Sequence, residues 1–356
     1  MTLSCIAQFS IGCTRYLDKD GAALCALPAF AAATENLLPL YRAMVRTRAF
    51  DAKAVALQRT GRLGTFASSL GQEAVSIGVA AAMRPEDVFL PSFREQGGQL
   101  WRGVTALELL LYWGGDERGS DFKQARADFP VCIPVGSHAP HTVGVAMAFK
   151  LRSESRVAVC VLGDGATSKG DFAEALNMAG VWNAPAVFVI NNNQWAISVP
   201  VERQTAARTL AQKAVAAGIP GEQVDGNDVI AVRAVVERAI ARARAGGGPS
   251  LIEAITYRLG DHTTADNASR YRHDEEVSPH WATEPVARLR HHLATTIGWD
   301  KKQEEHVQTE TAAVVDRAAE EFLATPPSPR EAVFDWTYAA LPADLAGQRR
   351  AMLEGS

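Results

Sequence analysis

The sequence predicts an α/β fold with a central, mainly parallel sheet that is flanked by helices. Three apolar stretches, residues 156–162, 186–190 and 250–256, have lengths typical of strands and contain few polar residues. Nearly unbroken apolar strands are typical of parallel sheets, because helices cover both faces of such sheets. Segments with helical spacing separate these stretches, as strand–helix–strand units require. A shorter strand is predicted at residues 88–90, after Pro85.

Helices are expected on both sides of this central region. Apolar residues with three- and four-residue spacing start near residue 36 and predict a helix, until Gly61 and Gly64 interrupt the pattern. Another helix is predicted around Phe172, Leu176 and Ala179, between two of the strands. Further helices are predicted at residues 71–83, 104–113, 138–151, 228–245, 282–295 and 301–324.

The chain divides into three regions. Residues 1–35 form a weakly specified N-terminal extension, and residues 36–325 hold the α/β domain with its C-terminal helices. Residues 326–356 form a proline-containing linker and a C-terminal tail. Helical extensions are therefore expected at both ends of the α/β region. Two polar segments are predicted to be loops: residues 115–128, which we expect to be mobile, and residues 260–272.

Composition excludes several classes of protein. The formal net charge of −4 and the lack of a basic run argue against nucleic-acid binding, which needs clustered Lys and Arg. No apolar run approaches the ~20 residues that a membrane-spanning helix needs. The five cysteines form no CxxC motif, so neither a zinc site nor a disulfide framework is indicated. Since the first thirty residues lack secretory features, we expect a cytoplasmic protein.

Polar residues end two of the predicted strands. Asp164 lies in the sequence GDG after the first strand, and Asn193 ends three asparagines after the next. They are separated by about one strand–helix–strand unit, ~30 residues, so both should lie at the same edge of the sheet. Each motif alone is more typical of an ordinary turn, but the pair at this spacing favours a function.

The chemistry of this pair indicates a metal and an anion. A carboxylate and an amide offer hard oxygen ligands that suit Mg²⁺ or Ca²⁺. The helix expected to begin near residues 167–169 would direct free N–H groups at an anion. The sequence therefore predicts a site that holds a diphosphate through a divalent cation.

At this point the residues resemble a known family. The segment GDGATSKGDFAEALNMAGVWNAPAVFVINNNQWAISVP resembles the alpha subunit of the decarboxylating component of 2-oxo acid dehydrogenase complexes. The segments ASSLGQEAVSIGVAAAMRPEDVF, PSFREQGGQLWRGV, PVGSHAPHTVGVAMAFK and TYRLGDHTTADNASRYR resemble other parts of the same family, in the same order. The resemblance extends from about residue 37 to the tail and implies the thiamine-diphosphate-binding fold.

The resemblance implies how the metal and the diphosphate would be held. Asp164, Asn193 and the backbone carbonyl of Trp195 would bind Mg²⁺. Gly165 and Ala166 would donate backbone N–H groups to the diphosphate of thiamine diphosphate.

It also implies contacts with the rest of the cofactor. Arg94, with Phe93 beside it, would pair with a phosphate, which suits the fork of a guanidinium group. The backbone at Ile133 and Val135 would contact the aminopyrimidine ring. His262 would reach the cofactor or the substrate near the thiazolium ring, as a catalytic residue.

Three positions depart from the family's pattern. Phe93 stands where many members have Tyr, so one hydroxyl contact with the phosphates is expected to be lost. Asn191 replaces a Gln, Arg or Glu, and Gln96 stands where some members have His. None of these changes removes a metal ligand.

Other polar and aromatic residues have more than one interpretation. His138 and His141 are interpreted as structural, although His138 could line the site. Tyr257 and Arg258 either approach the phosphates or simply end a strand. Phe66, together with Phe93, is expected to line the space for the substrate.

The function that the resemblance implies is the decarboxylation of pyruvate or a branched-chain 2-oxo acid. The acyl group would pass to a lipoyl group of an acyltransferase component, whose disulfide is the acceptor. No Glu is identified that could activate the pyrimidine ring, so a beta subunit would supply it in an alpha2beta2 heterotetramer, and the chain alone would be inactive. The alternatives are an acetoin dehydrogenase alpha subunit and a non-catalytic structural or regulatory subunit. A dinucleotide-binding domain is disfavoured because no GxGxxG follows a strand.

Overall fold

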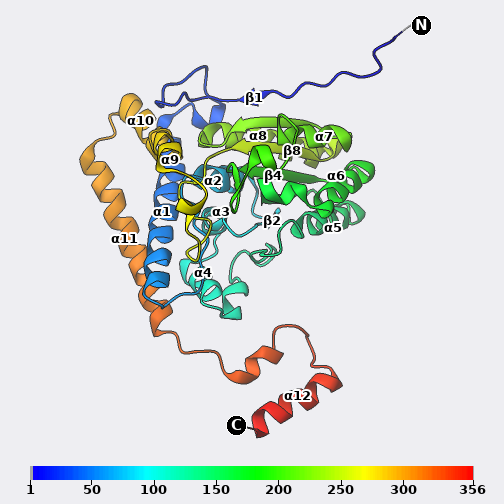
Figure 1. Ribbon diagram of the computed structural model, residues 1–356, viewed down its shortest axis with the longest axis vertical. Coiled ribbons are helices and arrows are strands. Elements are labelled where there is room, and N and C mark those ends of the chain that lie inside the picture. The colour runs from blue at the N-terminus through cyan, green and yellow to red at the C-terminus, as the bar shows by residue number, and fades with distance from the viewer. Residues whose placement is uncertain (1–2, 356) are drawn as a thin grey trace.

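One parallel sheet of six strands lies at the centre of the computed structural model, which describes residues 3–355 (Figure 1). All neighbouring strands in this sheet run parallel, as predicted. In spatial order the strands are β1 (Cys13–Thr14), β7 (Gly221–Asp225), β8 (Ser250–Ile255), β4 (Ala186–Asn192), β3 (Ala158–Gly163) and β2 (Val88–Leu90). A separate antiparallel pair consists of β5 (Trp195–Ala196) and β6 (Val199–Pro200).

Helices surround the sheet (Figure 1). The predicted helices are all present, with shifts of a few residues at their ends. The helices are α1 (Leu38–Arg59), α2 (Glu73–Ala82), α3 (Gln96–Trp101), α4 (Ala106–Trp113), α5 (His138–Leu151), α6 (Gly170–Trp182), α7 (Lys213–Ala216), α8 (Val229–Arg242), α9 (Asp274–Trp281), α10 (Pro285–Ile297), α11 (Lys301–Ala324) and α12 (Ala343–Glu354). No helix among residues 3–355 is long and apolar enough to cross a membrane.

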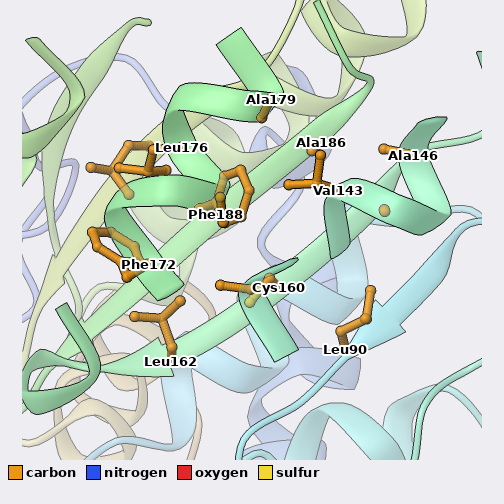
Figure 2. Packing of buried hydrophobic residues seen from close by; sticks show 14 of the residues in the cluster. Leu90, Val143, Ala146, Cys160, Leu162, Phe172, Leu176, Ala179, Ala186 and Phe188 are labelled. Atoms are coloured by element: carbon orange, nitrogen blue, oxygen red, sulfur yellow. The ribbon is translucent and has the colours of Figure 1, made fainter. Parts of the chain in front are cut away.

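The two faces of the sheet bury separate apolar clusters, because side chains of a strand alternate between its faces. On β3, Cys160 and Leu162 pack with α5 and α6, for example against Phe172 (Figure 2). The intervening residues Val159 and Val161 face the other side, where α2 and α8 contribute their apolar faces. This double coverage explains why β3 and β4 read as unbroken apolar runs in the sequence.

The elements that were not predicted include the strands β1, β5, β6 and β7 and the helices α3, α7 and α9. The strand β7 has the sequence GEQVD, in which only Val224 is fully buried, and β1 pairs with it at the edge of the sheet. Edge strands of this kind lack the apolar pattern that identifies a central strand. The helices α3 and α9 were also missed, because α3 contains two glycines and α9 contains Pro279.

The segment 115–128, which we expected to be a mobile loop, contains a 3₁₀ helix at Glu117–Ser120. Its end is held in place by Asp128, which is buried and pairs with Arg102 at 2.5 Å. At the other end of the chain, residues after α11 run away from the body of the protein to α12 (Figure 1).

Candidate active site

The ends of β3 and β4 bring Asp164 and Asn193 to one edge of the sheet. The two strands are neighbours, and Gly163 at the end of β3 is opposite Asn191 of β4. Asp164 directly follows Gly163, and Asn193 lies two residues after Asn191. Both side chains line a cavity of about 600 Å³. The expected juxtaposition of the two side chains is therefore present in the fold.

The ten residues to which the resemblance assigns contacts with the metal or the cofactor all line this same cavity. They come from loops that follow strands at their carboxyl ends or precede α5, which is where ligands bind in open parallel sheets. The residues are Phe93, Arg94, Ile133, Val135, Asp164, Gly165, Ala166, Asn193, Trp195 and His262.

Asp164 is a buried carboxylate directly after the end of β3. Its side chain is 1% exposed, and its Oδ2 accepts a hydrogen bond of 2.6 Å from Gln204 Nε2. Burial raises the pKa of Asp164 above its usual value, and this effect is opposed by hydrogen bonds, including that from Gln204, and by the positive charge of Arg258. A buried carboxylate in this state gains from a bound cation, which would replace the lost hydration.

The neighbouring oxygen atoms suit such a cation. The amide oxygen of Asn193 and the backbone carbonyl of Trp195 belong to residues that line the cavity beside Asp164. Residues 3–355 contain no group of three or more His, Cys, Asp or Glu side chains that could hold a metal. A cation here would depend on one carboxylate with amide and carbonyl oxygens, a donor set that fits Mg²⁺ and does not fit Zn²⁺.

The backbone after Asp164 passes close to Ala196, and this close approach requires glycine at position 165. A Cβ atom on Gly165 would lie 2.7 Å from the Cβ of Ala196, which is too close for two carbon atoms. A 3₁₀ helix spans Asp164–Ser168, and α6 begins at Gly170. The helix therefore starts slightly later than the residues 167–169 that the sequence predicted, and the 3₁₀ turn directs the backbone near Gly165 into the cavity.

Two arginines surround His262 at another part of the cavity. Arg94 Nη2 lies 3.0 Å from His262 Nδ1 and donates to the His262 carbonyl at 2.7 Å. Arg258 Nη1 lies 3.4 Å from the same Nδ1 atom, and it also donates to the carbonyl of Trp195 at 3.2 Å. Arg94 is further held by the carbonyl of Ser68 at 2.5 Å. The guanidinium groups are thus fixed by backbone oxygens before any ligand binds.

This arrangement determines the protonation of His262. Burial, followed by the charges of Arg94 and Arg258, lowers the pKa of His262 to about 4. Because arginine offers only donors, Nδ1 of His262 must be the acceptor, and the single proton of the neutral ring is on Nε2. Burial and the charge of Arg258 also lower the pKa of Arg94, to about 10.

The loop that carries His262 is held by a network of polar contacts. Asp266 Oδ2 accepts from the backbone N–H of His262 at 3.0 Å and from the hydroxyl of Tyr271 at 2.5 Å. The same hydroxyl accepts from Arg258 Nη2 at 2.9 Å. Arg272 donates to three successive backbone carbonyls that begin with that of Arg258. The predicted polar loop is therefore ordered by its own side chains.

Other sequence interpretations have mixed outcomes. Phe66 packs in an aromatic cluster with Phe50 and Trp113 and not along the cavity, so the interpretation of Phe66 as a substrate contact was wrong. His138 lines the cavity, and its Nε2 lies 2.8 Å from the carbonyl of Val161. That contact fixes the ring at the start of α5.

His141 and Tyr257 have contacts outside this cavity. The ring of His141 lies against Phe129, whereas Tyr257 stacks on His280 and donates to Glu276 at 2.7 Å. Both residues therefore have structural contacts.

Three cavity or cavity-linked residues were not identified from the sequence. Gln204 reaches Asp164 from beyond β6, and Gln72 reaches Asn193 from the start of α2. Glu95 is 3% exposed, and burial raises its pKa to about 7. No local pattern marks Gln72 or Gln204, whereas Glu95 stands next to Arg94 in the sequence and could be interpreted there only as its ion-pair partner.

Known proteins are similar to this chain over most of its length. The family model described as "Dehydrogenase E1 component" matches residues 41–330, which include every residue discussed in this site. The 3-methyl-2-oxobutanoate dehydrogenase subunit alpha of Mycobacterium tuberculosis is 45% identical over 316 residues, 88% of this chain and 86% of the relative.

Two further relatives carry a different substrate in their names. The pyruvate dehydrogenase E1 component subunit alpha of Acholeplasma laidlawii is 44% identical over 283 residues, 79% of this chain and 82% of the relative. The protein of the same name from Staphylococcus aureus is 40% identical over 315 residues, 88% of this chain and 85% of the relative. The chain is thus similar over most of its length to proteins of both kinds.

Proposed function

The chain belongs to the dehydrogenase E1 component family, as an alpha subunit of the branched-chain 2-oxo acid or pyruvate type, and from this premise we propose its reaction. We propose that it decarboxylates a 2-oxo acid with thiamine diphosphate and Mg²⁺, and passes the acyl group to a lipoyl disulfide of an acyltransferase component. The E1 family is dependent on thiamine diphosphate in general. The active unit would be an alpha2beta2 heterotetramer in the cytoplasm.

The single observation that carries this proposal is that one cavity contains two chemically different groups of residues. One end presents the buried Asp164 carboxylate with the oxygens of Asn193 and Trp195, a set that suits a divalent cation. Another part presents His262 between Arg94 and Arg258. A ligand that has a metal-bound diphosphate and a reacting centre that develops negative charge would interact favourably with both groups of residues.

Thiamine diphosphate, when bound, supplies the electron sink for the loss of carbon dioxide. The chain's own residues supply position and electrostatics. Asp164, Asn193 and Trp195 would hold the metal ion to which the diphosphate binds. Gly165 would allow backbone N–H groups to approach the phosphate oxygens closely.

His262 would act as a neutral donor. Its Nε2 proton is fixed in place because Nδ1 accepts from the arginines. A neutral imidazole with this tautomer can donate to an oxygen of the substrate or the departing acyl group. Burial, together with the charges of Arg94 and Arg258, keeps the ring neutral, and the two arginines favour negative charge nearby.

The names of the relatives indicate the substrate class but do not separate its members. Relatives at 45% and 44% identity are named for 3-methyl-2-oxobutanoate and for pyruvate. An acetoin dehydrogenase alpha subunit is the alternative enzyme. A non-catalytic subunit is disfavoured because Asp164, Asn193 and His262 are all in place.

The test is turnover by the complex of this chain with its beta subunit. We expect decarboxylation of pyruvate or 3-methyl-2-oxobutanoate that requires both thiamine diphosphate and Mg²⁺, with little activity on acetoin. Asp164→Asn should lower turnover on the order of 100-fold, since it removes the only charged oxygen of the proposed metal site. Asp171→Asn, in the first turn of α6, is the matched control and should keep wild-type turnover. Turnover of acetoin alone, or turnover of 2-oxo acids without the cofactor, would contradict the proposal.

A further inference from the structure

Gln72 lies at the wall of the cavity and contacts a residue of the proposed metal site. It is 1% exposed, stands directly before α2 and lines the cavity with Asn193. Asn193 Nδ2 lies 3.0 Å from Gln72 Oε1. Nothing in the sequence pattern or in the family comparison assigns a role to this side chain.

The orientation of both amides follows from one backbone group. The N–H of Trp195 can only donate, and it lies 3.2 Å from Asn193 Oδ1. The other end of that amide, Asn193 Nδ2, is therefore the donor toward Gln72, which must accept with its Oε1. Gln72 thus fixes the Asn193 amide with its oxygen on the side of Trp195, where the proposed metal ligands gather.

The same contact leaves the other end of Gln72 without a partner. Its Nε2 is buried and has no hydrogen-bond partner among the described residues. Buried polar groups are almost always paired, so an unpaired donor at a cavity wall indicates a ligand acceptor. The cavity ligand that our proposed function places beside Asn193 is a diphosphate, whose oxygens are acceptors only.

Resting on that proposed function, we propose that Gln72 is a positioning residue with two tasks. Its Oε1 orients the Asn193 amide, and its Nε2 donates a hydrogen bond to an anionic oxygen of the cofactor's diphosphate. The contribution should appear in cofactor affinity and should depend on the phosphates of the cofactor. A substrate contact would instead change KM for the 2-oxo acid.

The experiment uses the alpha–beta complex and two substitutions of Gln72. Gln72→Glu keeps an acceptor for Asn193 but removes the donor, and Gln72→Met removes both without adding charge. Calorimetry with Mg²⁺ should show thiamine diphosphate binding at least about tenfold weaker in both variants, as expected for a hydrogen bond to a charged group. Binding of thiamine without phosphates should be unchanged. Gln72→Met should also need more Mg²⁺ for half-saturation, because Asn193 loses its orienting partner.

Gln99→Glu is the matched control. Gln99 is 2% exposed and its Nε2 also lacks a partner, but it belongs to α3 and does not line the cavity. This variant should bind thiamine diphosphate with wild-type affinity.

Several results would overturn the inference. They are wild-type affinity in Gln72→Met, an equal loss of affinity for thiamine and thiamine diphosphate, or a change confined to KM for the 2-oxo acid. If the wild-type complex itself bound no thiamine diphosphate, the proposed function would fail first.

Discussion

His262 lies in an environment that opposes its protonation. Two guanidinium groups approach the same ring nitrogen, Arg94 at 3.0 Å and Arg258 at 3.4 Å. The backbone N–H of His262 is held by Asp266, which fixes the main chain at this residue. Burial and both positive charges together lower the pKa of the imidazole to about 4. The ring is therefore neutral at every pH near 7.

This pKa shift predicts how the stability of the protein depends on pH. The folded pKa is about 4, below the ordinary value of 6.5, so the unfolded chain takes up a proton first as the pH falls. The contribution of His262 to the free energy of unfolding is fully present above about pH 6.5 and decreases toward pH 4. In urea unfolding between pH 7 and pH 4.5, His262→Asn should lose less stability than the wild type.

The exposed His273 offers the control for this measurement. His273→Asn should show the pH dependence of the wild-type protein. If His262→Asn lost as much stability on acidification as the wild type, the neutral, arginine-bound state of His262 would be wrong.

Residues of the site were predictable from the sequence when they lie in a local motif. Asp164 and Asn193 each end an apolar run, and that run fixes the edge of the sheet where they meet. Gln72 contacts Asn193 across 121 residues of sequence, and Gln204 contacts Asp164 across 40. Such contacts depend on tertiary packing, which no local pattern encodes. Phe66 was misjudged for the same reason, because an apolar side chain fits a core as well as a pocket.

At the scale of elements, the central strands of the sheet could be predicted from the sequence, whereas the strands at one edge could not. The strands β3 and β4 are covered on both faces, so nearly all their residues are apolar. The edge strand β7 has polar residues on both sides of Val224, and β1 has only two residues. Their pairing adds the N-terminal segment to the sheet, which the weak pattern of residues 1–35 did not indicate.

Asp228 joins this N-terminal segment to a central helix. Its Oδ2 accepts from the backbone N–H groups of Tyr16 and Leu17, at 2.8 and 2.7 Å. Its Oδ1 accepts from Ile230 and Ala231, both at 3.0 Å, which caps the N-terminus of α8. The side chain is completely buried, so each of these N–H groups would lose its partner without contact to water if Asp228 were removed.

Asp228→Ala should therefore lower the free energy of unfolding by about 3 kcal/mol, more than a helix cap alone contributes. Asp300→Ala is the matched control: Asp300 caps α11 through Gln303 but is exposed and bonds no distant segment. Its loss should cost about 1 kcal/mol. Equal losses in urea unfolding of the two variants would mean that the contacts with Tyr16 and Leu17 contribute nothing.

At the scale of the whole molecule, the cavity is incompletely covered. Ile133, Val135 and Ile197 line it and are 49%, 47% and 55% exposed. Apolar side chains gathered in this way at a cavity mouth are typical of surfaces that another protein covers. The described residues of the cavity include the buried Glu95, whose carboxyl is held by the backbone N–H of Arg94 at 3.2 Å. That carboxyl is engaged by the backbone beside Arg94, and we continue to assign the activating Glu to a beta subunit.

We therefore expect the purified chain alone to be folded but unable to decarboxylate any 2-oxo acid at an enzymatic rate. Addition of the beta subunit should restore turnover, because a second surface would close the cavity, exclude water and supply the missing carboxylic acid. The measurement is carbon dioxide release by the chain alone, by the beta subunit alone and by their mixture, each with thiamine diphosphate and Mg²⁺. Circular dichroism of the chain alone serves as the control for folding. A folded chain that turned over substrate at the rate of the mixture would show that the exposed apolar mouth needs no partner, and the division of the active site between two subunits would have to be abandoned.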